Sequence, residues 1–159
     1  PTESAQKELK QRVEDAVSAT RAAMEEGIVP GGGIALFNVS EPARSGLLPE
    51  VGQIIKRAAE APLRAIISNS GESPDGVIQK LKEEKREKEN GVWIGFNAVN
   101  NKVMNLKEAG IIDPLKVVKT AFINAVSVAA NYLVVGSAIT ELPEKKEKPG
   151  MGGGMGEDY

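Results

Sequence analysis

The stretch that decides the fold of this chain is GIIDPLKVVKTAFINAVSVAANYLVV, residues 110–135. It contains Asp113 followed by Pro114, which is typical of a helix start, with an acid at the N-cap and a proline at the first helical position. From Leu115 to Val135 small or apolar residues occupy nearly every face. Because a helix that is apolar all round is normally buried, the sequence predicts a buried central helix over residues 115–135.

A second helical pattern lies near the other end of the chain, over residues 4–26. Leu9, Val13 and Val17 recur on one face, and Gly27 supplies a stop signal. At 1.5 Å per residue this helix is about 35 Å long, which is long for a small domain. We therefore expect an arm that reaches away from the main body.

Between these two helices the sequence predicts shorter elements separated by turn signals. In chain order they are a glycine-rich loop at 27–33, a short helix-forming segment at 34–37, a helix from Val51 that Pro62 interrupts, a second helix from Leu63 to Gly71, a third from Pro74 into the charged run 83–89, and a strand at 92–96 that is half of a small hairpin. The predicted fold class is mainly α, with one small β-hairpin.

Composition narrows the possible chemistry. The chain has 159 residues, a formal net charge of −2, and neither Cys nor His. This length suits one modest core, and the even mixture of charges offers no positive field for nucleic acid. The lack of Cys and His excludes disulfides, structural zinc, thiol nucleophiles and histidine bases. Any chemistry must use carboxylates, lysines, hydroxyls or backbone amides.

The ends of the chain give further expectations. No apolar run approaches the ~20 residues of a membrane span, so we expect a cytoplasmic protein without membrane contact. The chain begins at Pro1 rather than Met, so we expect a piece of a longer protein. The tail Pro149–Gly156 is almost all Gly and Met and cannot offset its ordering entropy. We predict disorder over residues 144–159.

Asp15 is the first candidate for chemistry. On the helical wheel it lies nearly opposite the apolar stripe, beside Ala19 and Ala22, so a ligand has room to approach it. In a chain without His, a carboxylate is the natural group to orient a water for attack on a phosphate. The alternative is a solvated acid on an exposed helix face.

The glycines Gly31–Gly33 are the second candidate. Their backbone N–H groups suit an anion, and the absence of side chains lets a base or ribose approach the main chain. The run is neither a Walker A loop nor a G-x-G-x-x-G fingerprint. The alternative is a flexible connection between helices.

Three further residues have both a functional and a structural interpretation. Asp113 is a suitable acceptor for ribose hydroxyls, but capping alone also explains an acid there. Asn97 and Ala98 offer an amide and backbone groups that suit an adenine edge, whereas Asn is equally common in turns.

The order of the motifs resembles that of group I chaperonins of the GroEL type. They are Arg12–Ala16 (RVEDA), Gly27–Gly33 (GIVPGGG), Glu60–Arg64 (EAPLR), Phe96–Ala98 (FNA), Gly110–Pro114 (GIIDP) and the Gly/Met tail. This resemblance covers the whole chain. It implies part of the intermediate domain over residues 1–26, the second half of the equatorial ATP-binding domain over 27–143, a helical bundle with a small hairpin, and a tail over 144–159.

The resemblance also implies roles for single residues. Asp15 matches the intermediate-domain aspartate that activates the hydrolytic water. The implied ATP contacts are Gly32, Asn97, Ala98, Ile111 and Asp113, with Asp113 holding the ribose. No metal ligand is implied in this chain, because the Mg²⁺-binding aspartate and the phosphate loop of the family lie in the other half of the domain.

The implied function is ATP-driven refolding of unfolded proteins inside a ring of identical subunits. Co-chaperonin and unfolded clients are expected to bind through an apical domain that these residues do not include, and this chain alone is expected to have little or no ATPase activity. The alternative is a non-enzymatic helical interaction module derived from the equatorial domain. A stand-alone nucleotide-binding protein is disfavoured because the phosphate loop is missing.

Overall fold

The computed structural model of the chain describes residues 2–40, 48–87 and 91–141. Its elements in chain order are α1 Glu3–Glu26, β1 Ile28–Pro30, α2 Ile34–Ser40, α3 Pro49–Asn69, α4 Pro74–Glu87, the 3₁₀ turn η2 Gly91–Trp93, β2 Ile94–Asn97, β3 Lys102–Asn105, β4 Ile112–Pro114 and α5 Leu115–Leu133. The mainly helical fold class is confirmed, and β2 and β3 form the small antiparallel hairpin. The predicted tail over 144–159 lies outside the described residues.

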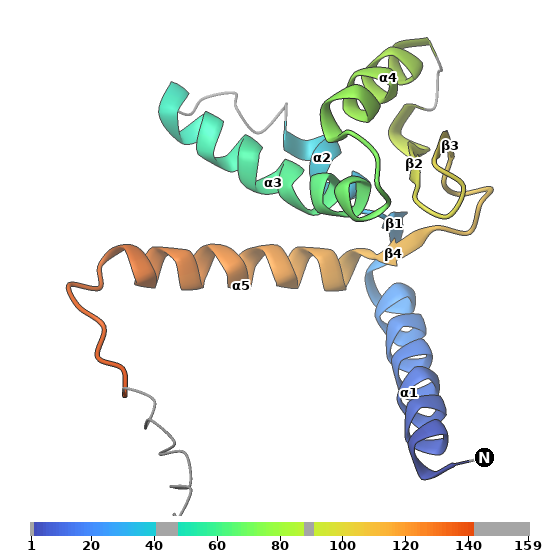
Figure 1. Cartoon of the computed structure of the whole chain (residues 1–159), viewed down its shortest axis with the longest axis horizontal. Coiled ribbons are helices and arrows are strands. Elements are labelled where there is room, and N and C mark those ends of the chain that lie inside the picture. The colour runs from blue at the N-terminus through green and yellow to red at the C-terminus, as the bar shows by residue number, and fades with distance from the viewer. Residues whose placement is uncertain (1, 41–47, 88–90, 142–159) are drawn as a thin grey trace, which may run out of the picture.

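The elements are arranged around a short pair of strands, β1 and β4. Figure 1 shows α1 and α5 leaving this pair in different directions, while α2, α3, α4 and the hairpin form a body on its other side. Helix α1 confirms the predicted N-terminal helix, and it ends at Gly27, whose φ of +85° requires glycine. The expected arm is therefore present.

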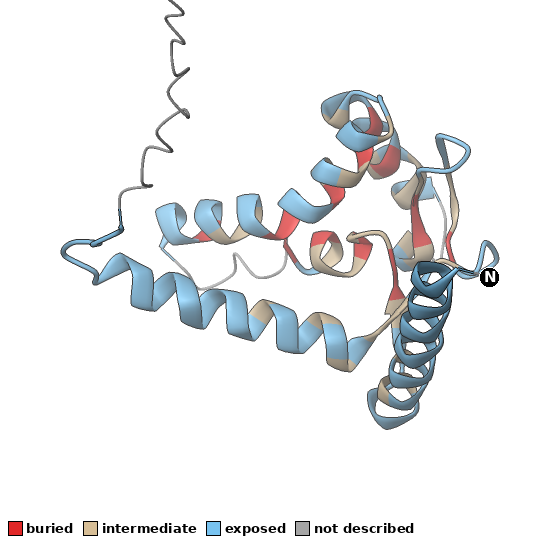
Figure 2. Cartoon of the chain, turned by 60° about the horizontal axis from the view of Figure 1, so that its bottom comes forward, coloured by how far each residue is buried: buried red, intermediate tan, exposed pale blue. Residues whose placement is uncertain are grey.

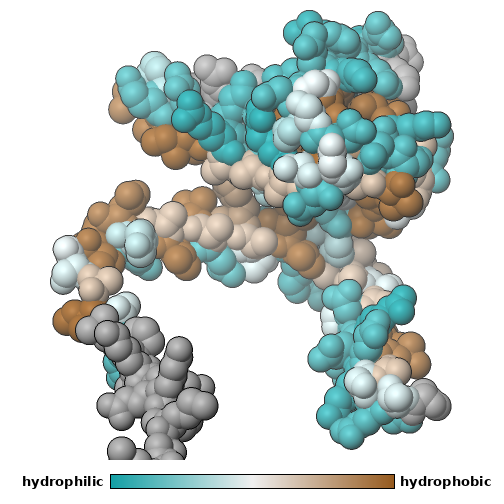
Figure 3. Space-filling view, viewed as in Figure 1, coloured by the Kyte–Doolittle hydropathy of each residue, from teal (hydrophilic) through white to brown (hydrophobic). Residues whose placement is uncertain are grey.

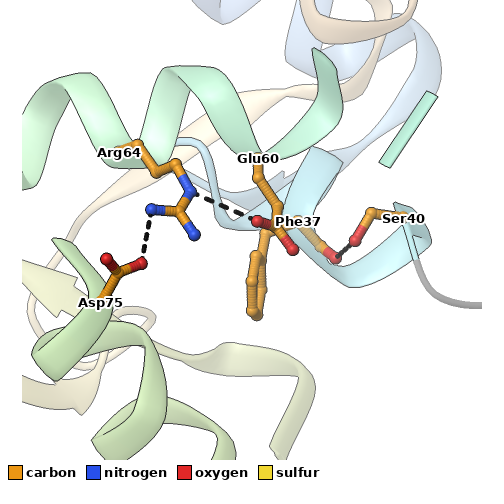
Figure 4. Close-up of polar contacts among 5 residues, drawn as sticks. All are labelled: Phe37, Ser40, Glu60, Arg64 and Asp75. Carbon is orange, nitrogen blue, oxygen red and sulfur yellow. Dashed lines mark hydrogen bonds and ion pairs between the residues drawn. The ribbon is translucent and has the colours of Figure 1, made fainter. Parts of the chain in front are cut away.

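The core of the body lies where α2, α3, α4 and β2 meet, and Figure 2 shows the buried residues gathered there. The side chains with no exposed surface are aliphatic, and a serine accompanies them: Ile34, Ser40, Leu63, Ile67, Leu81 and Leu106. The buried Ser40 hydroxyl donates a hydrogen bond of 2.7 Å to the Phe37 carbonyl (Figure 4). Its polar group is thus satisfied inside the core.

Glycines set how closely the elements of this core approach. Gly33 has a φ of +77°, and a Cβ built on it would lie 2.8 Å from the backbone nitrogen of Leu63. A Cβ on Gly95 would lie 2.4 Å from Leu106 Cδ1. The body therefore packs α2 against α3, and β2 against the segment after β3, through positions that have no side chain.

Ion pairs of Arg64 add polar ties to the packing of α3 and α4. The Arg64 guanidinium reaches Glu60 Oε2 at 3.3 Å and Asp75 Oδ1 at 2.8 Å, as Figure 4 shows. Glu60 is 7% exposed, so its carboxylate depends on this partner more than the exposed Asp75 does. The contacts join consecutive turns of α3 and connect α3 to the start of α4.

The helix α5 differs from the sequence prediction in two ways. It is present at Leu115–Leu133, but none of its residues is buried, and Val126 and Leu133 are 52% and 86% exposed. Figure 3 shows apolar side chains along its visible surface. The prediction of a buried central helix is therefore wrong for this chain, because the described elements cover too little of the helix. No helix within the described ranges is long and apolar enough to cross a membrane.

The start of α5 is the second difference. Pro114 occupies the N-cap position with no side-chain cap, and Asp113 lies in β4. Asp113 is therefore not the cap that the sequence predicted, because strand pairing holds it in an extended conformation one residue earlier.

The predicted break at Pro62 is also wrong. Helix α3 runs without interruption from Pro49 to Asn69 with Pro62 inside it. A proline inside a helix costs about 3 kcal/mol through the lost N–H bond and a backbone clash. Leu63 and Ile67 follow Pro62 and lie one helical turn apart, and both side chains are fully buried. Their burial offsets the cost of the proline and keeps the helix continuous.

The approach of α2 to α3 gives a first prediction. The control is Gly71, which has a φ of +85° and no atom within 4 Å of its ideal Cβ position. Gly71→Ala therefore costs only the strain of the left-handed conformation, about 1–2 kcal/mol. Gly33→Ala adds a backbone clash to the same strain, and we expect a further loss of about 1–3 kcal/mol. Hydrogen–deuterium exchange of α2 and α3 peptides in the complete protein measures the difference. Equal losses of protection in the two variants would contradict this packing.

Candidate functional site

The candidate site is built on the antiparallel pair of β1 and β4, each three residues long. The register aligns Val29 with Asp113 and Pro30 with Ile112. A backbone bond from Gly31 N–H to the Ile111 carbonyl, 3.1 Å, extends the pairing by one step. This pairing brings the glycine turn of residues 31–33 next to the segment that leads into α5.

The glycine turn also contacts the end of the hairpin. Gly32 has a φ of +63°, and its ideal Cβ position lies 3.7 Å from the Phe96 carbonyl oxygen, one residue before Asn97. The Ile111 N–H in turn donates to the Leu106 carbonyl at 2.9 Å, which holds the chain after β3 in place. The structure thus gathers three segments, around Gly32, Asn97 and Ile111, into one neighbourhood.

Asn97 is partly committed to the hairpin turn. Its Oδ1 accepts from the Val99 N–H at 2.9 Å, and its Nδ2 lies 3.4 Å from the Met104 sulfur. Sulfur is a weak acceptor, so the Nδ2 group keeps donor capacity for a stronger partner. Ala98 is exposed and offers its backbone groups beside it.

Asp113 is the carboxylate of this neighbourhood. It is half-buried in β4, and among the described residues its carboxylate has no hydrogen bond or ion pair. Burial raises the pKa of Asp113 above its ordinary value, since removal from water disfavours the charged form. A half-buried acceptor without a partner is suited to hydroxyl donors of a ligand.

Asp15 lies apart from these residues. It is exposed on α1, and at 1.5 Å per residue it stands about 17 Å from the end of the helix that joins the strand pair. The base of α1 is fixed to α5 by Lys116 with Glu25 and by Lys119 with Glu26 at 2.6 Å. The structure therefore does not bring Asp15 together with the other predicted site residues.

The pairing of β1 with β4 was the feature that sequence reasoning missed. Each strand is too short for a period of two to be seen, and Pro30 and Pro114 lie within them. The sequence signal is that each strand lies within one of the motifs, GIVPGGG or GIIDP. In the described part of the chain, no group of three or more Asp and Glu residues is arranged to hold a metal ion.

Comparison with solved structures gives the class of protein. The chain is similar to a crystal structure of a group III chaperonin in the open state, with a TM-score of 0.77 and 25% sequence identity over 87% of the chain. The fold is therefore a chaperonin fold. The match covers 29% of the length of that chaperonin.

Comparison with protein families agrees with the structural match. A model of the TCP-1/cpn60 chaperonin family matches residues 1–141. This chain belongs to the TCP-1/cpn60 chaperonin family.

The burial of Asp113 predicts how stability depends on pH. Because its folded-state pKa lies above the unfolded value, charging Asp113 disfavours the folded state, and this penalty is complete once the pH exceeds the folded pKa. We expect Asp113→Asn to stabilise the β1–β4 pair at neutral pH, with a gain that disappears as the pH falls toward about 4. Protection factors of the β1 and β4 peptides, measured across this range in the complete protein, test it. A variant that loses protection at neutral pH would show that the carboxylate is a structural group.

Proposed function

We propose that this chain is the carboxyl-terminal portion of a group I chaperonin subunit that binds and hydrolyses ATP to refold unfolded proteins inside a ring. The observation that carries the proposal is the β1–β4 pair, which brings the glycine turn, the end of β2 and Asp113 together. Membership of the chaperonin family supports it. The order of the sequence motifs supports group I in particular.

The proposed nucleotide contacts follow from the groups present. The backbone at Gly32 has no side chain to obstruct a phosphate or ribose, and its positive φ turns its N–H out of the regular pattern. Asn97 and Ala98 present amide and backbone groups to the adenine edge, and Ile111 gives it an apolar contact. Asp113 accepts from the ribose hydroxyls, where a hydrogen bond to a charged group is worth about 1.5–3 kcal/mol.

The proposed catalytic acid is Asp15, acting as the group that orients the attacking water. Because it stands on α1 away from the strand pair, it acts only after the arm moves toward the nucleotide. Gly27 joins α1 to β1, and a glycine at this position gives the backbone the conformational freedom that such a rotation needs. Timing of hydrolysis by movement of the arm couples the chemistry to the shape of the subunit.

The remaining parts of the ATP site lie outside this chain. Mg²⁺, when bound, neutralises phosphate charge, and its ligands and the phosphate loop are expected from the other half of the equatorial domain. The Asp113 and Asn97 side chains only hold and orient the nucleoside end. We therefore propose that this chain alone has little or no ATPase activity.

The exposed apolar surfaces support assembly with further protein. A groove of about 310 Å³ between α2 and α5 is lined almost wholly by apolar side chains, Leu36 and Phe122 among them. Together with the exposed faces of α1 and α5 it needs cover from the rest of the subunit and the neighbouring subunits. Co-chaperonin and unfolded clients are proposed to bind elsewhere, through an apical domain, in the cytoplasm.

Two substitutions in the complete subunit separate the proposed roles. We expect Asp15→Asn to lower the rate of ATP hydrolysis at least tenfold with little change in ATP affinity, because it removes a group that acts on the water. Asp113→Asn is expected to weaken ATP binding by about 10- to 100-fold. Turnover and equilibrium binding of ATP measure the two effects.

Glu14→Gln is the matched control for Asp15→Asn. Glu14 is the preceding acid on α1, it is 64% exposed, and its contact with Lys10 is a long surface pair of 3.7 Å. It should leave hydrolysis unchanged. If rings form and Asp15→Asn hydrolyses ATP like the unmodified protein, the role of Asp15 is wrong, and complete absence of ATP binding would favour the interaction-module alternative.

Assembly is tested by the native mass of the protein from its source cell, with and without ATP. We expect a very large complex of subunits that are each much longer than this chain, because the apolar faces described above require cover. A monomer or dimer of this chain would overturn the ring proposal. It would leave a small interaction module as the better interpretation.

A further inference from the structure

A second site is indicated by a hollow of about 400 Å³ where the last turns of α4 meet α2. It is lined by Phe37 and Asn38 from α2 and by Lys82, Lys85 and Arg86 from α4. None of these lining residues is acidic, and none belongs to the proposed ATP contacts. The hollow is therefore a concave cationic surface with a floor of one aromatic ring and one amide.

Lys85 is the central group of this hollow. Its ammonium donates to Asn38 Oδ1 and lies 4.9 Å from the centroid of the Phe37 ring. Both contacts are with neutral groups, and burial lowers the pKa of Lys85 to about 8. The ammonium is thus partly withdrawn from water without a carboxylate partner among the described residues, an arrangement that favours an added anion.

The neighbouring cations strengthen this preference. The Lys82 ammonium lies 6.0 Å from the same Phe37 ring, and Arg86 lines the same hollow. Basic residues in the last turn of a helix interact favourably with its dipole, which explains their presence there. It does not explain why the Lys82 and Lys85 ammonium groups both lie near the Phe37 ring, where their like charges repel one another.

The acids that line an adjoining hollow have partners of their own. An adjoining hollow shares Lys82 and Arg86 and is also lined by Arg64, Asp75, Gln79 and Glu83. Asp75 is bonded to Arg64 at 2.8 Å, and Glu83 accepts from Gln79 at 3.2 Å. From α2 and η2, the other elements packed here, the described residues contribute no charged group. Among the described residues no carboxylate bonds to Lys85, so an anionic ligand is suited to supply its countercharge.

We propose that this hollow binds a phosphate group, either inorganic phosphate or the terminal phosphate of a small phosphorylated metabolite. Its oxygens would accept from the free N–H groups of Lys85 and from the guanidinium of Arg86, which are charge-assisted bonds. The size of the hollow lies within the range of small-molecule sites, roughly 300–1,000 Å³. The site shares no residue with the proposed ATP contacts.

The test measures the reactivity of individual lysines in the complete protein. Brief acetylation with acetic anhydride between about pH 6 and 10, with peptide mass spectrometry, gives a labelling midpoint for each lysine. In chloride we expect Lys85 to have a midpoint near 8. In inorganic phosphate at matched ionic strength we expect this midpoint to rise by about one pH unit. At a pH below the midpoint, the labelling of Lys85 then falls about tenfold. Lys80, exposed on the same helix, should not change.

Two variants and a second ligand sharpen the result. Arg86→Gln is expected to abolish most of the phosphate-dependent shift, and Lys80→Gln is the matched control that should retain it. Glucose 6-phosphate replaces phosphate in a parallel series: a shift at lower concentration than phosphate requires identifies a metabolite, and a shift with phosphate alone identifies the free ion. The proposal is overturned if the Lys85 midpoint is ordinary in chloride, if phosphate leaves it unchanged, if Lys80 shifts equally, or if Arg86→Gln keeps the full shift.

Discussion

The antiparallel pairing of β1 with β4 is the constraint on which the rest of this structure depends. It joins two segments far apart in sequence through three aligned residue pairs, Ile28 with Pro114, Val29 with Asp113 and Pro30 with Ile112. Two flanking backbone bonds, from Leu115 N–H to the Gly27 carbonyl and from Gly31 N–H to the Ile111 carbonyl, lengthen it at both ends. Closing so long a loop costs entropy that grows only slowly with its length, so a short pair supported by packing is sufficient. From this pair α1 and α5 diverge, and beside it the glycine turn meets the hairpin.

The distribution of apolar surface explains why the chain has a small core and large exposed apolar faces. The core collects side chains from α2, α3, α4 and β2, while α1 and α5 contribute no buried residue. Helix α5 has the composition of a core helix but contacts described elements mainly near its start, through α1 and β4. Under the proposed function, the apolar composition of α5 suits a position covered by further protein.

Much of the local structure was predictable because it follows from local rules. The amphipathic stripe and Gly27 predicted α1, and the turn signals predicted a strand at 92–96 that corresponds to β2 as half of a hairpin, whereas its partner β3 was not placed. The errors arose where a distant segment decides the local conformation. The sequence pattern predicts that Asp113 caps a helix, but strand pairing places it in β4. It predicts that Pro62 ends a helix, but buried residues before and after Pro62 keep α3 continuous.

The candidate site was predictable in part for the same reason. Motif order in the sequence selected Gly32, Asn97, Ile111 and Asp113, but it contained no information about how they meet. Their proximity depends on the close approach of Gly32 to the Phe96 carbonyl and on the register of β1 with β4. Both are properties of the backbone, which the pattern of side chains does not show. The cationic hollow around Lys85 was missed because a run of mixed charge is most simply a solvated helix end. The position of the Phe37 ring next to the Lys85 ammonium distinguishes a cationic hollow from a solvated helix end.

The separation of Asp15 from Asp113 determines what kind of mechanism this geometry permits. Asp15 stands exposed on α1 and Asp113 is half-buried at the strand pair, so under the proposed function a nucleotide held by Asp113 does not contact Asp15 in this arrangement. The contacts that hold the arm at its base include the backbone bond from Leu115 N–H to the Gly27 carbonyl and the ion pairs of Lys116 with Glu25 and Lys119 with Glu26, whose side chains are all at least 30% exposed. Exposed pairs of this kind contribute about 0–1 kcal/mol each, which is small beside the binding energy of a nucleotide. The ion pairs by themselves therefore oppose a movement of the arm only weakly. Under the proposed function, an acid carried on such an arm would separate the binding of ATP from its hydrolysis.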